Sequence, residues 1–171
     1  MTARRQKNQG YRLRIAALAA AIPATMAVWP GSAGQAFAAA TERVVIDRHT
    51  GLAIGGHDPV AYFTDGKPVL GKPGVETSEA GAIWRFCNEG NRTFFLAHPD
   101  VYAPRFGGYD PVDAAEGRIV AGRFNVWLIS GDRLYLFSRE EHRDAFAANP
   151  SHFKDEAAAN WPELRATLSD Y

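Results

Sequence analysis

Two short segments, residues 82–86 and 133–137, alternate in side-chain character with the two-residue period of a half-buried β-strand. Residues 82–86, 126–129 and 133–137 are rich in aromatic and branched apolar side chains, as strands usually are. The turn Ser130-Gly131-Asp132 separates the last two, which predicts a β-hairpin. Residues 41–47 and 52–54 predict a further hairpin near the start of the domain.

The segments after residues 86 and 137 predict short helices. Ser138 and Glu141 have the spacing of a capping box at the start of the second helix. His98-Pro99 and Asn149-Pro150 predict the helix ends, because a residue before proline avoids the helical region. Three phenylalanines are expected to face the core: Phe94, Phe95 and Phe146. The elements together predict an α+β fold, an antiparallel sheet with short flanking helices.

Two parts of the chain are similar in sequence at an offset of about 51 residues. GGHDPV at residues 55–60 returns as GGYDPV at residues 107–112, and the strand-to-helix junctions after them also match. Agreement across turn, strand and helix predicts a duplication. We expect two related strand-turn-helix units, 55–106 and 107–158, packed as one domain. Each Asp-Pro pair predicts a helix start, with the aspartate as cap.

Residues 1–40 have the pattern of a cleaved secretory signal peptide. Five basic residues precede the apolar stretch 15–28, and small residues around Ala38 resemble a signal peptidase site. The apolar stretch is interrupted by Pro23 and is short for a membrane span. We therefore expect cleavage, export by the general secretory route, and a periplasmic or secreted domain at residues 41–171 with no stable membrane insertion.

Removal of this leader changes the charge of the protein. The whole chain has 19 basic and 19 acidic residues, and the part after residue 40 keeps 14 and 19, a net charge of −5. This balance argues against a nucleic-acid partner, which requires a basic surface. Cys87 is the only cysteine, so no disulfide can form within the chain.

Motifs along most of residues 41–171 resemble the YHS domain family in its longer exported bacterial form. The resemblance is carried by GHDPVAYF at 56–63, WRF at 84–86, GGY at 107–109 and NWP at 160–162. It implies a small domain that binds metal through cysteines. At the family's cysteine positions the first unit has Ala61, Cys87 and Asn91, and the second unit has Asp113, Ser138 and His142. Asp110 follows Gly-Gly-Tyr, where the longer form commonly has a further cysteine.

One remaining thiol cannot form a thiolate-rich cage within the chain. If the Asp-Pro heads and strand-helix junctions converge, His57, Cys87 and Asp110 are the candidate ligands of a transition metal ion, copper or zinc. Cys87 at a helix N-cap would have a lowered thiol pKa. The plainer alternatives are a buried space-filling Cys87, a surface His57 and an Asp110 that only caps a helix. His142 is expected to face water, as are the other three histidines: His49, His98 and His152.

No catalytic or nucleotide-binding motif is present in the sequence. We therefore favour a non-catalytic metal-binding or metal-handling module. A second hypothesis is a small-molecule or protein-partner binding module, with Asp58, Tyr62 and Tyr109 lining a cleft between the units. Two tryptophans could join that cleft, Trp84 and Trp127, although alternating strands more often place such residues in the core. A third hypothesis is a thiol-dependent enzyme using Cys87.

Overall fold

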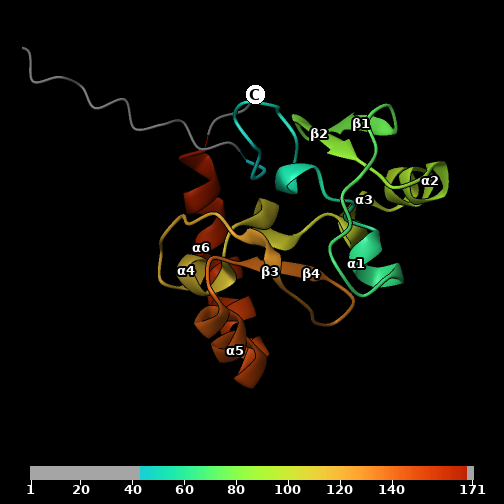
Figure 1. The fold of residues 1–171 in the computed structure, drawn as a ribbon. Helices are drawn as coiled ribbons and strands as arrows, with labels where there is room; N and C mark the ends of the chain where they lie inside the picture. Colours follow the sequence, from blue (N-terminus) through green and yellow to red (C-terminus); the bar gives the residue numbers. More distant parts are fainter. Residues whose placement is uncertain (1–42, 169–171) are drawn as a thin grey trace, which may run out of the picture. The chain divides into compact units, whose positions relative to one another are not determined.

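The computed structural model describes residues 43–168, and the predicted signal peptide at residues 1–40 lies outside them. Two antiparallel sheets of two strands each are flanked by short helices (Figure 1), which confirms the α+β class. The strands do not form the single sheet that was expected. None of the helices in this part of the chain is long and apolar enough to cross a membrane.

Twelve short elements follow one another along the described residues. The first six are η1 (Ile54–Gly56), α1 (Ala61–Thr64), β1 (Glu76–Glu79), β2 (Ala82–Arg85), α2 (Glu89–Ala97) and α3 (Pro99–Tyr102). The next six are η2 (Arg105–Gly108), α4 (Pro111–Ala115), β3 (Arg123–Ile129), β4 (Leu134–Phe137), α5 (Glu140–Ala148) and α6 (Pro150–Ala166). The predicted helix ends before Pro99 and Pro150 are confirmed.

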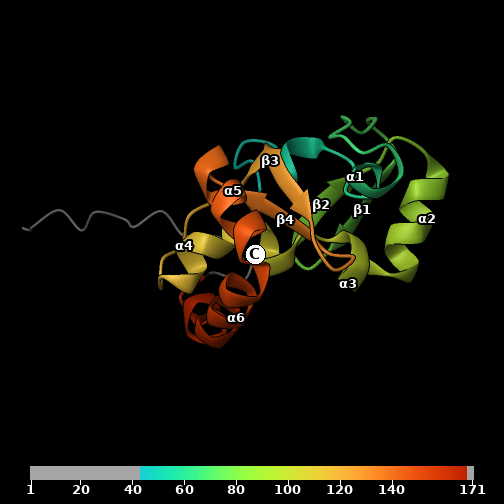
Figure 2. The same ribbon diagram turned by 90° about the horizontal axis from the view of Figure 1, so that it is seen from below.

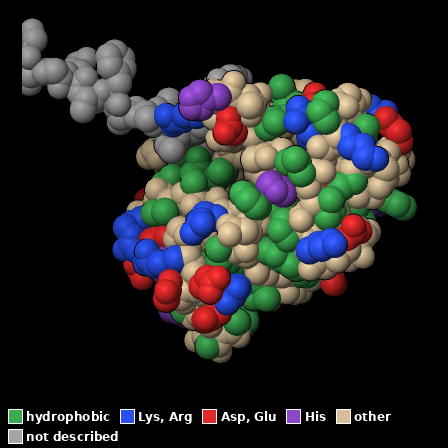
Figure 3. Space-filling model, viewed as in Figure 1, with side chains coloured by type: hydrophobic (Ala, Val, Ile, Leu, Met, Phe, Trp, Pro, Cys, Tyr) green, Lys and Arg blue, Asp and Glu red, His purple; other side chains and the backbone are tan. Residues whose placement is uncertain are grey.

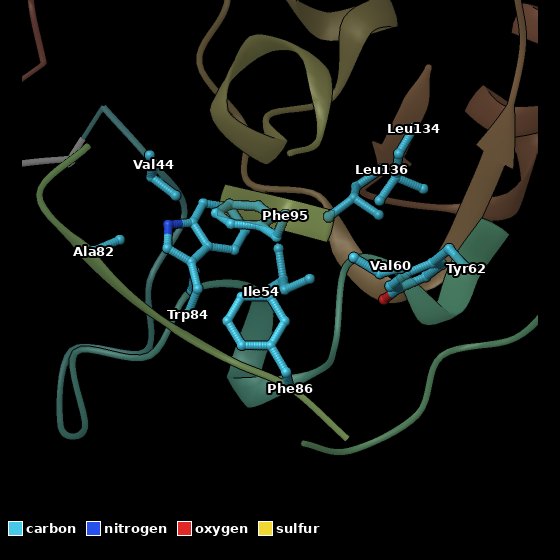
Figure 4. Packing of buried hydrophobic residues seen from close by; sticks show 11 residues of the cluster. Val44, Ile54, Val60, Tyr62, Ala82, Trp84, Phe86, Phe95, Leu134 and Leu136 are labelled. Atoms are coloured by element: carbon cyan, nitrogen blue, oxygen red, sulfur yellow. The ribbon is translucent and has the colours of Figure 1, made fainter. Parts of the chain in front are cut away.

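The β3–β4 hairpin separates two hydrophobic clusters. Successive side chains of a strand point to opposite faces, and β4 is buried on both. Leu134 and Leu136 belong to the cluster that contains Trp84 and Phe95 (Figure 4), whereas Tyr135 and Phe137 belong to the cluster around α4, α5 and α6. Seen from below, β3 and β4 lie between the elements of the first and second halves (Figure 2). This hairpin therefore joins the two halves.

The predicted pairing of residues 126–129 with 133–137 is confirmed, because Trp127 faces Leu136 and Ile129 faces Leu134 in an antiparallel register. Strand β2 pairs with β1, which the alternation of residues 82–86 alone did not predict. The expected N-terminal hairpin is reduced to one isolated bridge between Ile46 and Ala53.

The start of α5 differs from the prediction. Helix α5 begins at Glu140 with Arg139 as its N-cap, so the capping box of Ser138 and Glu141 is wrong. The Ser138 hydroxyl instead donates to Asp110, 28 residues earlier. Cys87 is likewise not a cap, because Asn88 precedes α2 and its side chain accepts the cap hydrogen bond.

The three helix phenylalanines do not share one environment. Phe95 and Phe146 are fully buried, whereas Phe94 is 55% exposed, so its predicted inward orientation is wrong. Phe94 is the immediate neighbour of Phe95 on α2, and adjacent residues on a helix lie about 100° apart. Only one of the pair can therefore face the core.

In both halves, the second glycine of the Gly-Gly pair accepts a backbone hydrogen bond from a glycine later in the chain. The N–H of Gly71 donates to the carbonyl of Gly56 at 3.0 Å, and the N–H of Gly122 donates to the carbonyl of Gly108 at 2.9 Å. These contacts place each glycine pair beside the loop that follows it. The two-unit repeat itself stays a prediction.

Candidate metal site

Three buried side chains of α4 and α5 come together with their polar atoms facing one another. Asp110 and Asp113 lie at the N-terminal end of α4, and His142 lies in the first turn of α5. One potential ligand atom from each lies within 4.8 Å of the others, and the three residues are 0%, 2% and 7% exposed. Among residues 43–168 this is the one group of three or more potential ligands of this kind.

Asp110 is held at this place by local and distant hydrogen bonds. It is the N-cap of α4, and its Oδ1 accepts a hydrogen bond from the N–H of Val112 at 2.9 Å, as a capping aspartate should. Its Oδ2 accepts from the N–H of Ser138 at 2.8 Å and from the Ser138 hydroxyl at 2.7 Å. The Asp110 carboxylate therefore links the start of α4 to Ser138, between β4 and α5.

One carboxylate oxygen of Asp113 is hydrogen-bonded to Arg118, and the other faces Ser138 and His142. The guanidinium of Arg118 donates to Oδ1 through Nε at 3.1 Å and Nη2 at 2.6 Å. Oδ2 lies 3.3 Å from the Ser138 hydroxyl and 3.4 Å from Nδ1 of His142. The hydrogen bond from Arg118 to Asp113 raises the pKa of the arginine above its ordinary value, so its charge is permanent. Arg118 thus fixes the orientation of a buried carboxylate.

The imidazole of His142 lies between a carboxylate and an arginine. Its Nδ1 is 2.8 Å from Oδ2 of Asp110, and its Nε2 contacts the guanidinium of Arg139. A buried His142 contradicts the expectation that it faces water. The reason is the hydrogen bond to Asp110, which joins residues 32 positions apart.

This arrangement has the composition of a divalent cation site. Both carboxylates are buried: Asp113 is paired with Arg118, and Asp110 accepts hydrogen bonds from Ser138 and lies 2.8 Å from His142. Buried charges are costly unless they are paired or bind a metal. Two carboxylate oxygens, an imidazole nitrogen and the nearby Ser138 hydroxyl are also ligand types that metal ions use in proteins. The buried group can therefore hold a metal ion.

The residues expected to bind metal do not gather as predicted. Of His57, Cys87 and Asp110, only Asp110 belongs to a group of potential ligands among the described residues. The ring of His57 stacks on Phe124 with centroids 3.9 Å apart, and its Nδ1 lies 3.1 Å from the carbonyl of Ile54. Burial lowers the pKa of His57.

Cys87 is hydrogen-bonded to Asp58, another buried aspartate. Its backbone N–H donates to Oδ2 of Asp58 at 2.8 Å, and its Sγ lies 3.9 Å from the carbonyl of Leu70. Burial and the Asp58 carboxylate raise the thiol pKa from 9.0 to about 11. The expected lowering of this pKa by a helix N-terminus is therefore wrong, and the protonated thiol gives no support to a thiol-dependent enzyme.

The predicted cleft residues Asp58, Tyr62 and Tyr109 are 0%, 1% and 2% exposed. They lie in the core instead of lining a groove, because the carboxylate caps a turn at Val60 and the Tyr62 hydroxyl donates to the carbonyl of Phe124. Trp84 is also buried, and Trp127 is half-buried.

The first half contains a counterpart of the candidate site that keeps the buried aspartate but lacks the imidazole. Oδ2 of Asp58 accepts from the N–H of Cys87 and from Nδ2 of Asn91 at 2.6 Å. Asn91 makes the contact that His142 makes in the second half, so an amide takes the place of the imidazole. No group of three potential ligands includes Asp58 among the described residues.

One signal in the sequence did point to the site. The family's cysteine positions in the second half carry Asp113, Ser138 and His142, and the structure brings these three side chains together beside Asp110. None of the three has a sequence spacing typical of metal ligands. Comparison of the chain with protein-family models, with curated proteins and with solved structures finds no match.

Proposed function

We propose that this protein is a non-catalytic metal-binding module of an extracytoplasmic compartment and that it binds one transition metal ion on Asp110, Asp113 and His142. The observation that carries the proposal is the convergence of two carboxylates and one imidazole, with ligand atoms within 4.8 Å of one another in a buried setting. The resemblance to YHS domains implies the same class of function, and Asp110 is common to the ligand set predicted from sequence and the proposed one.

The ligand set favours zinc over copper(I). Copper(I) is selected by thiolate and thioether ligands, whereas zinc accepts imidazole and carboxylate. Cys87 is bound to Asp58 through its backbone and is absent from the ligand group. Calcium and magnesium usually require more oxygen ligands than this pocket offers. Of the two metals expected from the sequence, copper and zinc, the ligand types therefore favour zinc.

A binding role without catalysis follows from the burial of the ligands. The side chains of Asp110, Asp113 and His142 are 0%, 3% and 9% exposed. A catalytic metal keeps one position open for water or substrate, and these exposures leave little access for a substrate. The charged side chains on the face drawn in Figure 3 are of both signs and interspersed, which supports a small ionic ligand over a nucleic acid.

Equilibrium dialysis followed by elemental analysis tests the proposal. The purified protein is dialysed against zinc, copper(II) or magnesium, and the bound metal per chain is measured. We expect about one zinc ion per chain, and loss of that zinc in Asp113→Asn because the amide carries no charge. Asp144→Asn is the matched control, because Asp144 is on α5 but pairs only with Arg143 at the surface. Absence of bound zinc, or equal zinc in Asp113→Asn, contradicts the proposal.

A second candidate function rests on a groove beside β3. The groove has a volume of about 350 Å³ and is lined by residues 45–47, 54–55 and 122–125. Phe124 is 41% exposed there and stacks on His57. This volume is at the lower end of the range of small-molecule sites, roughly 300–1,000 Å³. Ligand-induced NMR shifts confined to Phe124 and its neighbours would support this candidate, and their absence across a fragment library would exclude it.

A further inference from the structure

Three consecutive side chains at the start of β3 are exposed to solvent. Arg123, Phe124 and Asn125 all line the groove beside this strand. In a regular strand, successive side chains point to opposite faces. The register between β3 and β4 is irregular between Arg123 and Trp127, and a β-bulge of this kind redirects side chains. The irregularity therefore brings a guanidinium, an aromatic ring and an amide to one groove.

Phe124 is held in place from the protein side. The buried Tyr62 donates a hydrogen bond from its hydroxyl to the Phe124 carbonyl at 2.8 Å. The ring of Phe124 stacks on His57 with centroids 3.9 Å apart and an angle of 13° between the planes. The residue is still 41% exposed. The ring is thus positioned before a ligand arrives, which lowers the entropic cost of binding, and part of its apolar surface stays open for stacking.

The space beside this ring is kept open by a glycine. A Cβ at residue 55 would lie 3.7 Å from Cδ1 of Phe124. Gly55 has a φ of 64°, in the left-handed region that favours glycine. The groove volume of about 350 Å³ is close to the lower limit for small-molecule sites. It suits a ligand of one ring with a small substituent.

Two charged residues line the groove, Asp47 and Arg123. Oδ1 of Asp47 accepts three hydrogen bonds, from the N–H of His49 and from the N–H and hydroxyl of Thr50. The Arg123 side chain takes part in none of the hydrogen bonds and ion pairs within residues 43–168. A guanidinium without a partner beside an open aromatic ring favours an anionic ligand, because arginine pairs well with carboxylates.

We propose that this groove binds small aromatic carboxylates, with the ligand ring against Phe124 and the carboxylate paired with Arg123. The inference rests on the second candidate function, the small-molecule groove, and is independent of the metal site. It adds to that candidate the chemical class of the ligand. The amide of Asn125 supplies a further hydrogen-bond donor at the same wall.

NMR titration of the nitrogen-15-labelled protein with benzoate tests the proposal. Chemical shifts should change at residues 45–47 and 123–125. Benzylamine, which carries the opposite charge, and cyclohexanecarboxylate, which lacks the planar ring, are the comparison probes. We expect benzoate to bind at least about threefold more tightly than either. Equal or tighter binding of benzylamine would make Asp47 the dominant charge and overturn the proposal, and equal binding of cyclohexanecarboxylate would overturn stacking on Phe124.

Three variants assign the binding to the groove. Arg123→Gln should weaken benzoate binding about three- to fivefold, the contribution of an ion pair open to water. Phe124→Leu should weaken it about two- to tenfold through loss of ring stacking. Arg165→Gln is the matched control, an exposed arginine on α6 outside this groove, and should leave the dissociation constant unchanged.

The outcomes separate this inference from the one on which it rests. Equal weakening by Arg123→Gln and Arg165→Gln would show only a general effect of charge and reject the proposal. Binding of all three probes in the groove with equal affinity rejects the aromatic carboxylate class and leaves the small-molecule groove standing. Absence of shift changes at residues 123–125 with every probe rejects both.

Discussion

Asp58 and Asp110 make the same connection in the two halves of the protein. Each is completely buried, and each accepts a hydrogen bond at 2.8 Å from a backbone N–H in the short segment between a strand and the next helix, Cys87 in one case and Ser138 in the other. The two connections span 29 and 28 residues. In each half, one buried carboxylate therefore links the Asp-Pro segment to the segment between the strand and the next helix.

Loss of the first of these carboxylates, Asp58, should destabilise the fold. Asp58→Ala leaves the N–H groups of Val60 and Cys87 and the amide of Asn91 without their acceptor. Buried donors left unsatisfied cost about 1–3 kcal/mol each, so we expect a loss of roughly 3 kcal/mol in the free energy of unfolding measured in urea.

Asp65→Ala is the control, because Asp65 is exposed and its carboxylate accepts from the Thr64 hydroxyl. Its effect should stay within about 0.5 kcal/mol, as for most surface substitutions. Equal unfolding curves for Asp58→Ala and Asp65→Ala would show that the buried carboxylate is not a structural support.

Cys87 should behave as an unreactive thiol. Its pKa is raised from 9.0 to about 11, so at pH 9 only about one in a hundred native molecules carries the thiolate, against about half of unfolded ones. Alkylation by iodoacetamide, followed by mass spectrometry, should therefore be at least tenfold slower in the native protein than in urea. Comparable rates would indicate that the thiol is not shielded by burial and by Asp58.

Stability should decrease in acid through His57. Burial lowers the pKa of this histidine in the folded protein below 6.5, its ordinary value. The unfolded chain then binds the proton more readily, so the contribution of His57 is fully present above pH 6.5 and is lost as the pH falls towards the folded pKa. Urea unfolding over this pH range should show a steeper loss for the unmodified protein than for His57→Gln. Parallel pH profiles would mean that protonation of His57 is not linked to folding.

The local parts of this fold were predictable from sequence. The hairpin of residues 126–137 and the cap at Asp110 depend on contacts within a few residues, and neighbouring side chains specify them. The environment of His142 was not predictable in this way, since it depends on a hydrogen bond to Asp110 across 32 positions. The same limit explains the error at Ser138, whose spacing to Glu141 fits a capping box although its hydroxyl donates to Asp110.

The sequence predicted a metal site, but of the three predicted ligands only Asp110 belongs to the candidate site. Asp110 is among the ligands predicted from the sequence, whereas Cys87 was predicted from its place at a family cysteine position and His57 from its place beside the Gly-Gly pair. In the folded protein the backbone N–H of Cys87 is bound to Asp58 and the ring of His57 is stacked on Phe124. Residue type thus suggested a metal site, and only the packing of α4 against α5 brings together the group that could hold an ion.

Zinc titration of His142→Asn is the most direct test of the proposed metal site. Asn91 already shows that an asparagine can donate to a buried aspartate here, at 2.6 Å from Oδ2 of Asp58. The substitution should therefore keep the hydrogen bond to Asp110 and change the melting temperature little, while it removes the imidazole ligand. We expect one zinc ion per chain in the unmodified protein and an affinity at least about tenfold lower in His142→Asn. Equal zinc affinity in the two proteins, or no zinc binding by the unmodified protein, would contradict the account.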